Sequence, residues 1–302
     1  MATSMDIILK RPNKVYHPGE TLYGAVLVSN TSKGDVKHEG VMLQLDGLLS
    51  VQLSPRTQGL IDTFVNSPKP TVLQSEMVEV CKPGRLPPGQ SELAFEVPLP
   101  LSTPKKPIYE TFHGNCINIH YSLRATMKRS LLTKPLVQMI EFIVEHKPAD
   151  ATPPSTAREF TLSPNSVSNA GERARLPQFS VTGHIDTHNC SLSRPLTGQV
   201  CVERCNGGVI SSIELQLHRL ETCGSPAHFN TPTEVSEVQG WQVCDGDVQR
   251  GLIIPLCLPL PRAFTCATHT ADNFAIGFQV SLVVMFDNDH IVTESFPLVL
   301  TR

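Results

Sequence analysis

Residues 16–28 read YHPGETLYGAVLV, and residues 190–202 read CSLSRPLTGQVCV. In both stretches a turn precedes a glycine that stands eight positions after the first residue, and valines then alternate with other residues. A period of two, bounded by Pro and Gly, is typical of a β-strand. The chain therefore contains one strand motif twice, at positions 174 residues apart.

Two further pairs of similar four-residue runs support a duplication. MLQL at 42–45 corresponds to ELQL at 214–217, an offset of 172, and VPLP at 97–100 resembles IPLC at 254–257. Self-similarity at about half the length of a 302-residue chain indicates two copies of one domain. We expect domains at 1–150 and 151–302, joined by a stiff, Pro-rich extended connector that begins at His146.

The fold class follows from the strand signals. Seven alternating segments per half predict an all-β protein of two tandem immunoglobulin-type β-sandwiches. The polar stretch Asn165–Arg175 is expected to cross between the domains before Leu176 starts the second sandwich. The predicted strands are 6–10, 22–30, 40–53, 71–80, 92–98, 117–128 and 136–145, then 179–186, 198–203, 209–220, 235–243, 252–258, 274–286 and 291–300.

Composition excludes several classes of function. The net charge of −3 divides into +2 for residues 1–145 and −5 for 146–302, so no basic stripe for nucleic acid is present. No apolar run approaches the roughly 20 residues that a membrane-spanning helix needs. The nine cysteines and the lack of a basic, apolar leader favour reduced thiols in a cytoplasmic protein.

The best candidate for a metal site is a run in which His184, Asp186, His188 and Cys190 occupy every second position. Alternate residues of a strand share a face but lie roughly 7 Å apart, too far for all four to bind one tetrahedral ion. A solvated loop before the repeated strand is the alternative interpretation. We therefore expect no metal here.

No other pattern predicts catalysis. Cys201 and Cys205 lack a matching second pair for zinc, and the glycine-spaced run 84–91 has Gln90 where a phosphate-binding loop requires lysine. The chain has no Gly-x-Ser-x-Gly elbow, and Cys116 near His113 is expected at a strand entrance. We expect neither an enzyme nor a bound cofactor.

A small basic cluster comprises Lys128, Arg129 and Lys134, with Lys105 and Lys106 assigned to the same group. Such a cluster could contact an anionic membrane surface, at about 1 kcal/mol for each basic residue. A solvated strand end is the alternative.

Several runs carry a resemblance to a known family. They are KRPNKVYHPGE at 10–20, YETFHG at 109–114, MKRSLL at 127–132 and DGDV at 245–248. Together with the tandem sandwiches they resemble the arrestin fold and, within it, the vacuolar protein sorting 26 family, most of all its C-type members. The resemblance implies a non-enzymatic subunit of the retriever trimer, beside a helical-solenoid subunit and a small phosphoesterase-like subunit. It further implies work with the commander assembly and a cargo-selecting sorting nexin, on endosomes whose cargo returns to the cell surface.

The same resemblance implies where the solenoid subunit binds. In relatives the second domain grips the solenoid through a strand and a loop ending in Asp-Gly. Trp241 is the only tryptophan, and buried aromatic anchors often dominate such contacts. The alternative is that Trp241 and Val243 fill the second core. The matching residues here are Trp241, Gln242, Val243, Cys244, Asp245, Gly246, Arg250 and Gly251.

A second interpretation is an arrestin-type adaptor that binds cargo tails or ubiquitin ligases directly. Such an adaptor is expected to carry a PPxY motif. The two Pro-Pro pairs, at 87–90 and 153–156, both lack the tyrosine.

Overall fold

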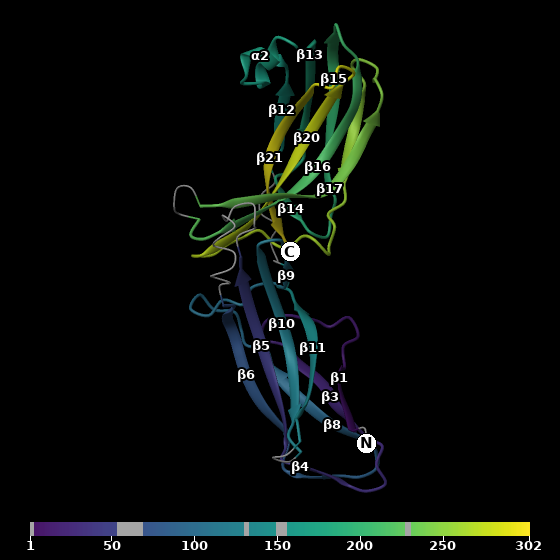
Figure 1. Ribbon diagram of the computed structural model, residues 1–302. Coiled ribbons are helices and arrows are strands. Elements are labelled where there is room, and N and C mark those ends of the chain that lie inside the picture. The colour runs from purple at the N-terminus through teal and green to yellow at the C-terminus, as the bar shows by residue number, and fades with distance from the viewer. Residues whose placement is uncertain (1–2, 53–68, 130–132, 149–155, 227–230) are drawn as a thin grey trace. The chain divides into compact units, whose positions relative to one another are not determined.

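The structure is a computed structural model that describes residues 3–52, 69–129, 133–148, 156–226 and 231–302. These residues form two compact units that divide between Lys147 and Pro148. Both units are built from mainly antiparallel β-sheets, with only two short helical turns in the described chain (Figure 1). The chain is thus all-β, as the alternation predicted.

Unit 1 packs a three-stranded sheet of order β1-β3-β8 against a larger one of order β2-β11-β10-β5-β6. Short β9 pairs with β10, and β4 pairs with β7. The core includes Phe142, whose ring contacts the rings of Tyr16 and Tyr121. The strands are β1 (Thr3–Leu9), β2 (Val15–Tyr16), β3 (Thr21–Asn30), β4 (Val36–His38), β5 (Val41–Val51), β6 (Thr71–Cys81), β7 (Gly84–Leu86), β8 (Gly89–Pro98), β9 (Phe112–His113), β10 (Ile117–Met127) and β11 (Leu136–Val144).

Unit 2 packs a sheet of order β12-β13-β15-β18 against one of order β14-β21-β20-β16-β17, and short β19 pairs with β20. Phe179 and Phe286 meet in its core, with ring centroids 5.0 Å apart. Its elements are β12 (Arg158–Leu162), the 3-10 turn η1 (Pro164–Ser166), α2 (Ala170–Arg173), β13 (Gln178–Ile185), β14 (Asn189–Ser191), β15 (Leu196–Asn206), β16 (Ile210–Cys223), β17 (Thr233–Asp245), β18 (Ile253–Leu258), β19 (His269–Thr270), β20 (Phe274–Phe286) and β21 (Ile291–Thr301).

The two units repeat one topology. β3, β5 and β8 of unit 1 take the places of β15, β16 and β18 in unit 2, and β2 pairs parallel to β11 as β14 pairs parallel to β21. The repeated sequence stretches fall on these equivalent strands. The duplicated body of two arrestin-like sandwiches therefore explains the internal echoes.

The repeated glycine has a packing reason in both units. A Cβ on Gly24 would lie 2.3 Å from the carbonyl oxygen of Ile8, and a Cβ on Gly198 would lie 2.2 Å from that of His184. A carbonyl at that distance leaves no space for a methyl group. Glycine thus allows β3 to approach β1 in unit 1 and β15 to approach β13 in unit 2.

One expectation about the chain between the sheets was wrong. The segment 165–175 does not precede the second sandwich, because β12 already pairs with β13 before it. The alternation in β12 is short: only Phe160 and Leu162 point into the core, which is too few for the pattern to be detected. Within the polar segment, Asn169 caps α2 by accepting hydrogen bonds from the first turn.

Candidate partner-binding site

Strand β17 is the last strand of the large sheet in unit 2. Among the described strands it pairs only with β16, so its outer edge is open. None of its thirteen residues is buried. An open edge exposes unpaired backbone donors and acceptors, which a partner can use.

Two bulges shape this edge. The register to β16 shifts so that Val238 and Val243 have no partner residue of their own. A bulge bends a strand and redirects its side chains, which hinders uncontrolled pairing of an open edge. The bulge at Val243 lies two residues before the end of β17, between Trp241 and the following turn.

Trp241 sits at the rim of the sandwich. It lies opposite Leu215, a core residue, so its side chain belongs to the core-facing side of the sheet. Nevertheless 44% of its surface remains exposed, because β17 is the outermost strand. Trp241 thus faces the core side of the sheet without being enclosed by it, and Val243 is half-buried, so neither side chain lies fully inside the second core.

The turn after β17 begins and ends with glycines in the left-handed region. Gly246 has φ 84° and Gly251 has φ 76°, conformations that glycine adopts without strain. The Gly246 amide donates to the carbonyl of Ser211 at 2.8 Å, and the Gly251 amide donates to that of Val202 at 2.9 Å. The turn is thus fastened to both sheets of its own unit.

An ion pair closes the turn from within. Arg250 binds Asp247 through two parallel hydrogen bonds, of 2.8 and 3.0 Å, and also donates to the carbonyl of Val248. The hydrogen bonds from Arg250 hold the pKa of Asp247 below its usual value, and the same contact raises the pKa of Arg250. A bidentate pair of this kind gives the turn one preferred shape.

The eight residues expected at the interface lie in the last five residues of β17 and the turn that follows it, and their role in binding stays a prediction. Cys244 faces the core side opposite Ile213, and burial raises the pKa of its thiol. The eight interface residues expected from the sequence do not include Asp247, although it closes the turn through Arg250. The three-residue spacing from Asp247 to Arg250 was the available signal.

Comparison with known proteins identifies the family. Residues 3–289 match the family described as Vps26, vacuolar protein sorting-associated protein 26. The chain belongs to this family. It is 36% identical to vacuolar protein sorting-associated protein 26C of Dictyostelium discoideum, over 311 aligned residues that cover 100% of both chains. Vps26 proteins are endosome-associated sorting adaptors with an arrestin-like fold rather than enzymes, and this chain is an adaptor of that type.

In this Vps26-family chain the basic residues occupy two places. Lys128 is exposed directly after β10, and Arg129 donates to the carbonyl of Lys134 at 3.3 Å. Lys105 and Lys106 follow β8 and precede β9, which pairs with the first residues of β10. β9 pairs near the start of β10 and Lys128 follows its end, so no observed contact joins Lys105 and Lys106 to the other three residues among those that the structure describes.

The structure also does not bring together the four alternating residues of the candidate metal site. His184 contacts Asp186 at 3.1 Å on the exposed side of β13, whereas Cys190 is buried in β14 and burial raises its pKa to about 11. The described chain contains no cluster of three potential ligands. Nor does any described helix have the length and apolar character needed to cross a bilayer.

Proposed function

We propose that this chain is the arrestin-like subunit of the retriever trimer and docks onto the helical-solenoid subunit through β17 and its turn. In this role it helps return transmembrane cargo from endosomes to the plasma membrane. The small phosphoesterase-like subunit completes the trimer, and the commander assembly and a sorting nexin connect it to cargo. One observation carries the docking proposal: the open edge of β17 presents exposed Trp241 beside a pre-shaped turn.

The physical argument rests on preorganisation. Trp241 offers a large, rigid contact area, and aromatic anchors of this kind supply much of the binding energy in protein interfaces. The turn is already held by its glycine hydrogen bonds and by the Asp247–Arg250 pair, so little entropy is lost on binding. A helical solenoid has exposed helix ends and loops that such an edge can contact.

The decisive experiment uses the double variant Val243→Asp with Cys244→Asn. Equivalent positions in β6 of unit 1 are Val80 and Cys81, so Val80→Asp with Cys81→Asn is the matched control. Each variant is co-expressed with the other two trimer subunits and purified. We expect the β17 variant to lose the solenoid subunit while the β6 variant retains it, with both showing β-sheet circular dichroism.

Two results would contradict the proposal. Assembly of the β17 variant at the wild-type level would remove β17 from the interface. Equal loss of assembly by both variants would show that any damage to an edge strand has this effect. Direct binding of cargo tails by the isolated wild-type chain would instead favour the arrestin-type adaptor.

Peripheral attachment to the endosomal membrane forms a separate part of the proposal. Lys128, Arg129 and Lys134 together could contribute about 3 kcal/mol at an anionic surface, which assists binding but does not secure it. Flotation with phosphatidylserine vesicles tests this directly. The variant Lys128→Glu with Lys134→Glu is expected to reduce flotation of the trimer, and unchanged flotation would exclude these residues.

A further inference from the structure

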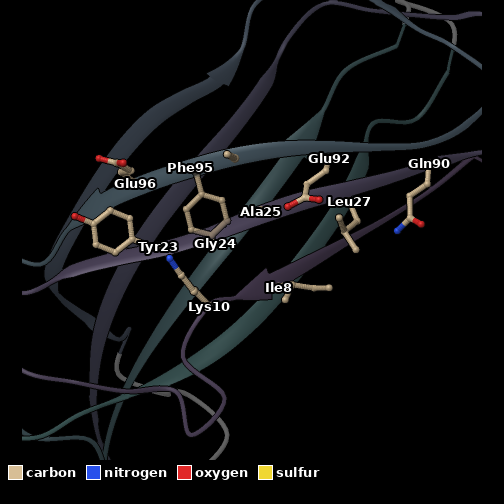
Figure 2. A pocket seen from close by; sticks show the side chains of 11 residues that line it. Ile8, Lys10, Tyr23, Gly24, Ala25, Leu27, Gln90, Glu92, Phe95 and Glu96 are labelled. Atoms are coloured by element: carbon tan, nitrogen blue, oxygen red, sulfur yellow. The ribbon is translucent and has the colours of Figure 1, made fainter.

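The outer face of the small sheet in unit 1 contains a shallow hollow of about 850 Å³ (Figure 2). Strands β1, β3 and β8 form this face, and alternate residues of each strand point to solvent. The hollow lies in the unit that does not contain β17. The hollow and the β17 edge therefore share no residue.

Small residues create the depression. Ala25 in β3 lies opposite Ile8 in β1 and opposite Ala94 in β8. At this position two of the three strands therefore carry an alanine, whose side chain is short. The next rows along β3 carry Tyr23 and Leu27, which are taller. The result is a small apolar depression over Ala25 and Ala94, between Tyr23 and Leu27, which we call the apolar seat.

The floor of the hollow is rigid. The ring of Phe95 packs against Gly24, where a Cβ would lie 2.5 Å from the ring carbon Cζ. Phe95 is buried, whereas Tyr23 and Ile8 are 46% and 48% exposed. The protein thus holds a preformed apolar surface open to solvent, and such surfaces often serve recognition.

Two carboxylates border the hollow along β8. Glu92 lies opposite Leu27 and Glu96 lies opposite Tyr23, one at each end of the seat. Neither carboxylate has a cation or hydrogen-bond donor among the residues that the structure describes. Lys10 is the single basic residue of the lining and lies on the far side, directly after β1. The β8 border is therefore acidic and unpartnered.

We propose that this hollow binds an extended segment of a partner protein with the pattern basic-x-aliphatic-x-basic. Glu92 and Glu96 are four residues apart on one strand, which corresponds to roughly 13 Å. Basic residues four apart in an extended peptide have the same separation, and the residue midway between them points to the same side. That central aliphatic side chain would enter the seat over Ala25 and Ala94.

The geometry argues against a membrane or nucleic acid as the occupant. Both are anionic, and the two carboxylates of β8 would repel them. A basic peptide instead gains charge complementarity at both ends and apolar burial at the centre. Paired charges at a rim mainly set specificity and the rate of association.

The test uses labelled peptides with the core Arg-Ser-Leu-Ser-Arg, flanked by Gly-Ser, and fluorescence anisotropy with the full chain. Glu92→Lys with Glu96→Lys is expected to weaken binding at least tenfold. The same variant should bind the charge-reversed peptide Glu-Ser-Leu-Ser-Glu better than wild type does. Glu76→Lys with Glu79→Lys on β6 makes the same charge change on the other sheet and is expected to leave binding unchanged.

The apolar seat needs its own variant. Ala94 is exposed, so Ala94→Trp is expected to fill the hollow without affecting the core and to weaken binding at least tenfold. Binding that is equal in the β8 and β6 variants, or that is unchanged when the central leucine of the peptide becomes serine, would overturn the proposal. Wild-type dimerisation that Ala94→Trp abolishes would also overturn it, because a second copy would then be the occupant.

Discussion

Strands β6 and β17 are equivalent edge strands that differ in what they present. β6 pairs with β5 and β17 pairs with β16, and each bulges at the same place, at Val80 in β6 and Val243 in β17. Opposite the matching core leucines, Leu43 and Leu215, β6 has Val78 and β17 has Trp241. The bulge thus belongs to the shared fold, whereas the tryptophan is particular to unit 2.

The segments that follow these strands differ as well. After β6 the chain forms β7, which pairs with β4 of the same unit. After β17 it forms the turn of residues 246–251, which the Asp247–Arg250 pair closes. The chain that follows β6 therefore forms another paired strand of unit 1. The chain that follows β17 forms a turn that an ion pair holds in shape. This difference teaches that the duplicated fold can stay constant while the exposed edge of one copy takes on a different surface.

The largest expected difference between equivalent positions lies at the start of each repeated motif. Tyr16 is 2% exposed and packs edge-on against Phe142, with Arg11 over its ring. Tyr16→Ala is expected to destabilise unit 1 by about 3–5 kcal/mol, because a large cavity remains. Cys190→Ala, at the equivalent site in unit 2, is expected to cost about 1 kcal/mol. Urea denaturation measures both values, and equal losses would contradict the comparison.

The two repeated glycines should behave alike. A Cβ at Gly24 or Gly198 would overlap a carbonyl oxygen of the neighbouring strand at 2.3 or 2.2 Å. Gly24→Ala and Gly198→Ala are each expected to lower the free energy of unfolding by about 1–3 kcal/mol. Gly34→Ala is the control, since nothing lies within 4 Å of its added Cβ. A lower free energy of unfolding in only one of the two variants would show that the repeated glycine does not have the same packing role in both units.

Exchanging Trp241 of β17 and Val78 of β6 tests directly what distinguishes these two edge strands. Trp241→Val is expected to weaken binding to a purified solenoid subunit at least tenfold, or about 1.4 kcal/mol, because the anchor is lost. Val78→Trp, at the equivalent site in β6, is expected to leave binding unchanged. Biolayer interferometry measures both. Tight binding by Trp241→Val would assign the contact energy to the turn instead.

The smallest effect concerns the ion pair of the turn. Because Arg250 lowers the folded-state pKa of Asp247, the pair stabilises the fold above the unfolded pKa of about 3.9. This contribution is lost as pH falls through the lower, folded-state pKa. Both side chains are about one-third exposed, so solvent screening limits the effect to roughly 0.5 kcal/mol.

Asp247→Asn should therefore reduce stability slightly at pH 7 and not at pH 2, as measured by thermal unfolding at both values. The matched control is Asp245→Asn, because Asp245 is an exposed carboxylate at the end of β17, two residues before Asp247. A loss that persists at pH 2 would indicate that Asp247 acts through hydrogen-bond geometry and not through its charge.

The sequence by itself determined the duplication and the all-β class. Alternating burial along a strand must appear as alternating polarity, so all fourteen predicted strands coincide with observed ones. Short strands such as β2, β9 and β14 were missed, because two or three residues are too few to show a period. The resemblance further predicts a partner site between Trp241 and Gly251, which stays a prediction.

Only the tertiary structure decided which strands lie at an edge and which outward faces combine. Strand order depends on pairing between distant segments, so the exposure of Trp241 could not be read from its neighbours in sequence. The hollow beside Glu92 and Glu96 requires residues from β1, β3 and β8, which are brought together by their register. Periodicity reports which side of a strand is buried, and long-range pairing alone determines what lies next to it.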